Sequence, residues 1–193
     1  MSSLPPRRTA VHPSMLPAGV PAGAVAAPPG RARGVVFLHA VSRALCPHVE
    51  WALGSIVDSE VRLDWQPQPV APPLLRAELP WVGRPGLGSR FMSALKGIPD
   101  IVAEVTEDPS PGREGERYAL TPTLGMHRAI IGVHGDILVS EDRLRAAVAG
   151  AASTGADLKD GIAYLLGTAW DVELEPYRSA GEDTPVRVLH HVV

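Results

Sequence analysis

An α+β domain is predicted for this chain of 193 residues by two features of its sequence. Strand-like apolar runs alternate with amphipathic helical segments from residue 34 onward, and no run approaches the roughly 18 apolar residues of a membrane-spanning helix. The first 33 residues hold seven prolines and show no apolar periodicity, so they bury too little surface to fold. We therefore expect a disordered Pro/Ala/Arg-rich head over 1–33 and a single α+β domain over 34–193.

The charge distribution narrows the classes of function. The head carries four arginines and no acid, so the remainder holds a net charge of −7 within an overall −3. An acidic domain argues against nucleic acid as the partner, and the hydropathy argues against a membrane. The single cysteine excludes an internal disulfide or a multi-cysteine zinc site, and it fits a reducing, cytoplasmic setting.

The first half of the predicted core is a buried strand over 34–40 followed by a helix over 46–57. Cys46 fits the N-cap of this helix, and Pro47 fits its first position, where no amide hydrogen is needed. The helical period places Trp51 opposite the apolar side that a sheet would cover. We therefore expect its indole to face a second layer, a partner or a ligand.

The second half consists of two strand-like runs, a helix and a fourth strand, over 61–66, 74–82, 89–97 and 101–106. The resulting order is β-α-β-β-α-β, which predicts a ferredoxin-like sandwich. It is extended by a β-hairpin and two C-terminal helices. The later elements are strands over 117–120, 128–133 and 137–139, helices over 141–150 and 157–177, and a closing strand over 186–192.

Five separated blocks carry a resemblance to a known family. They are CPHVEWAL (46–53), WVG followed by GLG (81–88), EVTEDPSPG (104–112), GDI (135–137) and LGTAWDVELEPYR (166–178). Together they resemble an actinobacterial family known only as a domain of unknown function, family 3145. The resemblance implies a cytoplasmic bacterial setting and a link to fatty-acid metabolism. It transfers no catalytic residue.

Cys46 and His48 form a candidate reactive site. A thiol at a helix N-terminus is favoured as a thiolate, and His48 follows two residues later, with His39 at the end of the preceding strand. The alternative is a small buried cysteine with no catalytic role, because the sequence shows no third residue to orient the histidine.

A glycine-rich passage forms a candidate anion site. Gly86 and Gly88 allow close backbone approach, and Ser89 opens a helix with free amides, while Arg84 and Arg90 flank it. The alternative is a turn in which Ser89 caps the helix and the arginines face water. The acids Glu104, Glu107 and Asp108 are expected to face water around a turn.

Trp51, Trp170 and Tyr177 form a candidate docking surface for a protein, and the alternative places Trp170 and Tyr177 against the domain itself. No histidine pair has the spacing of a metal site, and no cofactor motif is present, so neither a metal nor a cofactor is expected. No complete catalytic constellation is visible. The sequence therefore predicts a non-enzymatic regulatory or assembly factor that binds a partner protein. A small-molecule anion-binding module and a Cys/His enzyme remain open alternatives.

Overall fold

The structure is a computed structural model that describes residues 30–180. Its elements in chain order are β1 (Ala32–Val41), η1 (Arg43–Leu45), α1 (Cys46–Val57), β2 (Gln66–Pro67), β3 (Leu75–Gly83), α2 (Leu87–Leu95), β4 (Val102–Glu107), β5 (Gly115–Thr121), β6 (Gly125–Ile131), β7 (Ile137–Leu138), α3 (Glu141–Thr154), α4 (Leu158–Leu166) and α5 (Thr168–Ser179). All seven strands join one sheet in the order β2-β3-β1-β4-β5-β6-β7, and every neighbouring pair is antiparallel. The prediction of an α+β fold is confirmed.

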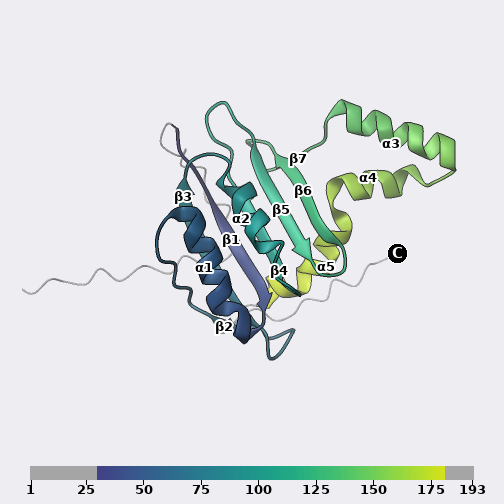
Figure 1. The fold of residues 1–193 in the computed structure, drawn as a ribbon. Helices are drawn as coiled ribbons and strands as arrows, with labels where there is room; N and C mark the ends of the chain where they lie inside the picture. The colour runs from purple at the N-terminus through teal and green to yellow at the C-terminus, as the bar shows by residue number, and fades with distance from the viewer. Residues whose placement is uncertain (1–29, 181–193) are drawn as a thin grey trace, which may run out of the picture.

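Helices α1 and α2 lie side by side over one face of the sheet (Figure 1). Side chains alternate between the two faces of a strand, and β1, β3, β4 and β5 each bury one set under these helices. Val36 and Leu38 of β1 belong to this core, and Phe91 of α2 is fully buried in it. This core joins both predicted halves of the domain.

The opposite face is covered by α5 in part. Trp170 and Leu174 of this helix pack on Ala40, Val102 and Ala119 from strands β1, β4 and β5. The Trp170 indole also donates a hydrogen bond to the carbonyl oxygen of Gly125, at 3.0 Å. The helix therefore sits behind the sheet in the view of Figure 1.

The strand predicted over 61–66 is reduced to the two residues of β2. The Glu50 carboxylate of α1 accepts hydrogen bonds from the backbone amide of Leu63, at 2.9 Å, and from the Trp65 indole, at 3.1 Å. These contacts hold the segment after α1 against that helix rather than in the sheet. The prediction of a longer strand was wrong there, although Val61 still joins the core and Leu63 and Trp65 pack against it.

The helix predicted over 157–177 is two helices, α4 and α5, separated by Gly167. Gly167 has a φ of +77°, and a Cβ atom at this position would lie 2.7 Å from the ring of His127. Only glycine fits this left-handed conformation and close approach without strain. The break turns α5 under the sheet.

Smaller differences concern the helix starts. Cys46 is the first residue of α1 and does not cap it, because the turn of η1 precedes it. Helix α2 begins two residues before the predicted start, after Gly86 at a φ of +89°. No helix in residues 30–180 is long and apolar enough to cross a membrane. The predicted strand over 186–192 and most of the predicted head lie outside the described residues.

Candidate functional site

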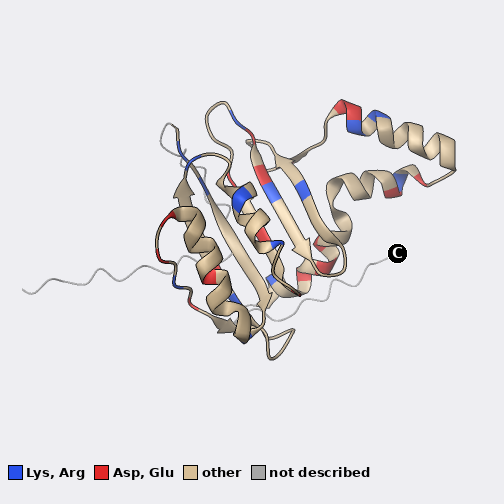
Figure 2. Ribbon diagram, in the orientation of Figure 1, with Lys and Arg blue, Asp and Glu red and all other residues tan. Residues whose placement is uncertain are grey.

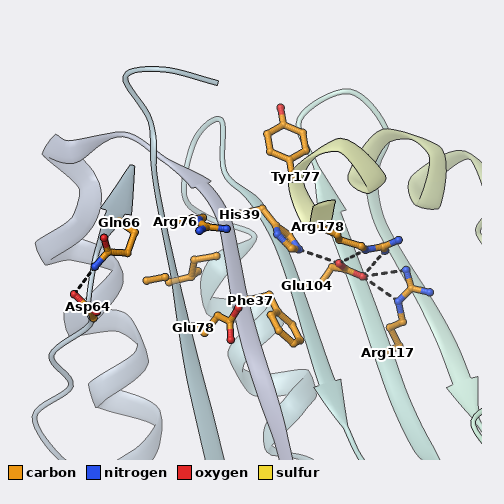
Figure 3. A pocket seen from close by; sticks show the side chains of 12 residues that line it. Phe37, His39, Asp64, Gln66, Arg76, Glu78, Glu104, Arg117, Tyr177 and Arg178 are labelled. Atoms are coloured by element: carbon orange, nitrogen blue, oxygen red, sulfur yellow. Dashed lines mark hydrogen bonds and ion pairs between the residues drawn. The ribbon is translucent and has the colours of Figure 1, made fainter. Parts of the chain in front are cut away.

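A cavity of about 660 Å³ opens on the sheet face that carries α5. Its residues come from β1, β2, β3, β4, β5 and α5 and from the segment before β2, and Figure 3 labels ten of them. They are Phe37, Leu38, His39, Asp64, Gln66, Arg76, Ala77, Glu78, Glu104, Arg117, Tyr177 and Arg178. The volume lies within the roughly 300–1,000 Å³ of small-molecule sites.

Glu104 bonds three other side chains that line this cavity, which we call the Glu104 cavity. Its Oε1 accepts hydrogen bonds from Arg117 Nε at 3.0 Å and from Arg178 Nη2 at 2.6 Å. Its Oε2 accepts one from Arg178 Nε at 2.7 Å and lies 2.9 Å from His39 Nε2 (Figure 3). Asp171 bonds both arginines from the far side. The network thus ties β1, β4 and β5 to the last turn of α5.

The network determines the charge on Glu104. Burial alone would raise the pKa of this carboxyl group, but hydrogen bonds from His39 and Arg178, with the charges of Arg178 and Arg117, lower it far below its ordinary value of 4.5. Both oxygens are occupied by donors, so Glu104 has no free position from which to accept a substrate proton. The described residues that line the cavity include no Ser, Thr, Cys or Lys nucleophile.

No hydrogen bond joins Cys46 to His48 among residues 30–180. Cys46 is 7% exposed, and its thiol lies 3.6 Å from the carbonyl oxygen of Ser42. Burial raises its pKa, and the nearby charge of Glu50 raises it further. The ring of His48 stacks on Trp51 at a centroid distance of 5.8 Å, and His39 bonds Glu104 on the other face of the sheet. The structure supports the alternative of a buried cysteine.

The predicted anion site at the start of α2 is filled from within. Glu107 Oε1 accepts the backbone amide of Gly86 at 2.8 Å, and its Oε2 accepts that of Gly88 at 2.9 Å. A Cβ atom at Gly88 would lie 3.1 Å from the Glu107 carboxylate, so a larger residue would crowd this contact. The two amides that a ligand would need are therefore occupied, so the expectation of an open amide site was wrong.

The side chains around that helix start have other roles. Ser89 donates a hydrogen bond to the carbonyl oxygen of Gly86, at 2.9 Å. Arg84, Arg90 and Arg31 line a second cavity of about 560 Å³, in which Asp58 is the one acid among the described lining residues. The expectation that the acids near β4 face water was wrong for Glu104 and Glu107, which are 5% and 6% exposed, whereas the Asp108 side chain is 45% exposed.

The three residues of the predicted docking surface do not share one surface. Trp51 lies on the outer side of α1 and is 70% exposed, as the helical period predicts. Trp170 is 6% exposed and lies between α5, to which it belongs, and the opposite face of the sheet. Tyr177 stands at the rim of the Glu104 cavity, 6.5 Å from the ring of His39. Trp170 and Tyr177 therefore pack on the domain itself, which was the alternative to a docking surface.

Helices α3 and α4 form a helical arm that projects beyond the sheet (Figure 1). None of the 14 residues of α3 is buried, and in α4 the only buried residue is Leu165, in its last turn. The charged residues of α3 are confined to its first five positions, so the rest of the helix is uncharged (Figure 2). The arm therefore has almost no core of its own.

Four exposed aliphatic residues of the arm share one side of it. A Cβ atom on Gly161 would lie 3.6 Å from Ala147, so the two helices approach closely there. Leu144 and Val148 are three residues before and one after Ala147, and Leu158 and Ile162 hold the same offsets from Gly161. In an antiparallel pair, residues at equal offsets from the point of contact project to the same side. The reason is that both helices are right-handed but run in opposite directions.

We call these four residues the apolar face of the arm. Their exposed fractions are 40% for Leu144, 54% for Val148, 37% for Leu158 and 39% for Ile162. The sequence analysis missed this face, because an apolar stripe on a helix has the same pattern whether or not a core covers it.

The sequence analysis missed the role of Glu104 for a related reason. The one signal was an acid in the middle of the apolar run 101–105.

Metal ligation has no support in the described part of the chain, where no group of three His, Cys, Asp or Glu side chains is placed to hold an ion. Neither a search of curated proteins nor a search of solved structures finds a match. A scan of protein families matches residues 35–191 to a family described as a protein of unknown function, DUF3145. The match covers most of the chain and the whole described domain except its first residues. The chain therefore belongs to the DUF3145 family.

Proposed function

We propose that this protein is a non-enzymatic regulatory or assembly factor that binds a partner protein through the apolar face of its helical arm. The single observation that carries the proposal is the 14-residue helix α3, which has no buried residue and yet exposes Leu144 and Val148. Most helical stability in proteins comes from packing of an apolar face, so a helix of this kind gains stability from a partner.

The partner we propose presents one amphipathic helix. A helix of 14 residues is about 21 Å long, so the arm offers a face of about 400 Å², half of the roughly 800 Å² per partner that stable complexes bury. A face of that size is small for a permanent pairing of two copies. It suits a single helix laid across the apolar face of the arm, with Leu144, Val148, Leu158 and Ile162 as its contacts.

The test compares a variant of the apolar face with a control variant outside the arm. In Leu144→Asp/Ile162→Asp, two charges enter the apolar face, while in Val172→Asp one charge enters an exposed position of α5 outside the arm, where Val172 is 70% exposed. Tagged full-length chains are used to capture proteins from the native cell. We expect a stoichiometric companion that the wild type and Val172→Asp retain and that the arm variant loses.

The companion is then purified and its affinity is measured directly. Burying two unpaired charges in an apolar contact costs several kcal/mol, so the arm variant is expected to bind at least about 100-fold more weakly. Equal retention of every companion by all three chains would contradict the proposal. A wild-type dimer in sedimentation that the arm variant dissociates would replace the helical partner with a second copy.

A second candidate function is binding of a small anion, and it is favoured by the cavity at Arg31, Arg84 and Arg90. Three cations against one acid create a positive site even though the amides of α2 are occupied. Inorganic phosphate is the probe. Protection against thermal unfolding by phosphate that Arg84→Gln/Arg90→Gln abolishes would support this function, and an identical shift in that variant would exclude this cavity.

The proposal also includes a ferredoxin-like fold, a cytoplasmic location and an actinobacterial origin. A ferredoxin-like assignment for the first half of the domain is supported by the strand order β2-β3-β1-β4, with both crossover helices on one face. A cytoplasmic location is supported by the single cysteine, which is buried and reduced. An actinobacterial origin and a link to fatty-acid metabolism rest on the resemblance of the sequence blocks alone.

A further inference from the structure

The Glu104 cavity holds two charged groups that its network does not use. Among the described residues, neither Arg76 nor Glu78 has a hydrogen-bond or ion-pair partner, although both line the cavity (Figure 3). Three of the other charges there are paired with one another, because Arg117 and Arg178 both bond Glu104. Asp64 accepts a hydrogen bond from the neutral amide of Gln66 at 2.9 Å, so its charge is not paired. The open charges on β3 are thus one cation and one anion, and Asp64 adds a second anion from the segment before β2.

Arg76 and Glu78 project from the same face of β3, because residues two apart in a strand share a face and are separated by about 7 Å. Glu78 lies directly across from Phe37 in the antiparallel pairing of β3 with β1. Arg76 is partly buried and Glu78 is exposed, so both reach solvent in the free protein. A ligand in this cavity would meet a positive and a negative side chain next to each other on β3.

The floor beside these charges is aromatic. The rings of Phe37 and His39 are stacked with an interplanar angle of 6° and a centroid distance of 6.0 Å. Tyr177 stands at the far side, and Figure 3 shows its hydroxyl group pointing away from the network. A flat apolar group would bury area against Phe37 and Tyr177.

We propose that this cavity binds a zwitterionic small molecule with a flat apolar group, of the class of an aromatic amino acid. Its carboxylate bonds Arg76, its ammonium group bonds Glu78, and its apolar part covers Phe37. A purely anionic ligand would leave Glu78 unpaired beside its own charge, and a purely cationic one would leave Arg76 unpaired. The Glu104 network holds the floor in place and does not contact the ligand through a free group. This site is independent of the helical arm.

Calorimetric titration of the full chain with three probes tests the proposal. The probes are L-phenylalanine, its N-acetyl derivative, which lacks the positive charge, and its amide, which lacks the negative charge. We expect L-phenylalanine to bind at least about tenfold more tightly than either derivative, because each derivative loses one charge-assisted hydrogen bond.

Two variants assign the charges to residues. Arg76→Gln should weaken binding of L-phenylalanine by about tenfold or more and leave binding of the amide unchanged. Glu78→Gln should weaken binding of L-phenylalanine similarly and leave binding of the N-acetyl derivative unchanged. The matched controls are Arg62→Gln and Glu60→Gln, an exposed pair outside the cavity, and neither should change any affinity.

Three results would overturn the proposal. They are the absence of binding of all three probes at millimolar concentration, a singly charged derivative that binds as tightly as L-phenylalanine, and an affinity for L-phenylalanine that neither cavity variant changes. The side chains of Arg76 and Glu78 make no hydrogen bond or ion pair with any other residue of 30–180, so both variants should fold, and circular dichroism checks this. The arm variant Leu144→Asp/Ile162→Asp should bind L-phenylalanine as the wild type does, which separates this proposal from that of partner binding.

Discussion

Replacement of Glu104 by glutamine should lower the stability of the domain more than any other single change of charge described above. Glutamine keeps one acceptor oxygen but presents an amide group to donors that include Arg178 and His39. Removing one partner of a buried ion pair costs about 3–5 kcal/mol. We expect about 3 kcal/mol here, because Asp171 still pairs both arginines.

Urea unfolding followed by tryptophan fluorescence measures this change. With a slope of about 2 kcal/mol per molar, the midpoint of Glu104→Gln should fall by about 1.5 M. Glu175→Gln is the control, because Glu175 is exposed and lies 3.7 Å from Arg178 in a surface pair worth less than about 1 kcal/mol. Hydrogen exchange should accelerate most in α5, which the network ties to the sheet. Equal midpoints for Glu104→Gln and Glu175→Gln would refute the reasoning.

The pH dependence follows from the same carboxyl group. The pKa of Glu104 is lower in the folded protein than in the unfolded chain, so the unfolded chain binds the proton more tightly. Its stabilising contribution is therefore complete above about pH 4.5 and is lost as the pH falls toward the folded pKa. Glu104→Gln should lose less stability than the wild type between pH 5 and pH 3, roughly the range in which the unfolded group titrates. Parallel losses in the two proteins would assign acid unfolding to other groups.

Three further predictions concern single side chains. Glu107→Gln should destabilise the domain by about 1–3 kcal/mol in urea unfolding, because one of the amides of Gly86 and Gly88 loses its acceptor, whereas no change would show that water replaces the carboxylate. Iodoacetamide should label Cys46 at least tenfold more slowly in the folded protein than in urea at pH 8, since the thiol is buried and its pKa is raised, and rapid labelling would restore the reactive site. Trp170→Ala should cost about 3–5 kcal/mol and Trp51→Ala under about 1 kcal/mol by the same unfolding assay, because the first indole is buried and the second is exposed, and equal costs would contradict their placement.

The fold class and the order of elements could be predicted because apolar periodicity is a local signal. The strand 34–40, the helix 46–57 and the hairpin around Gly135 depend on residues close in the chain. The segment 61–66 failed because its position depends on Glu50, which holds its backbone and Trp65 to α1. Short apolar runs do not reveal whether a sheet or a helix will cover them.

The candidate sites could be predicted far less well, because their chemistry depends on distant residues. Glu107 occupies the amide of Gly86 from 21 positions away, and Arg178 neutralises Glu104 from 74 positions away. Nothing local marks such pairings. The free amides of a helix start looked available to a ligand, and the acids near β4 looked solvated, because their partners were not visible in the sequence.

Hydrogen exchange of the helical arm tests partner binding most directly. In the isolated protein the amides of α3 should exchange far faster than those of β1 and β4, because no side chain of α3 is buried. In the complex with the companion, α3 and α4 should become protected while the strands change little. Slow exchange of α3 in the isolated chain, or an arm left unprotected in the complex, would show that the arm needs no partner.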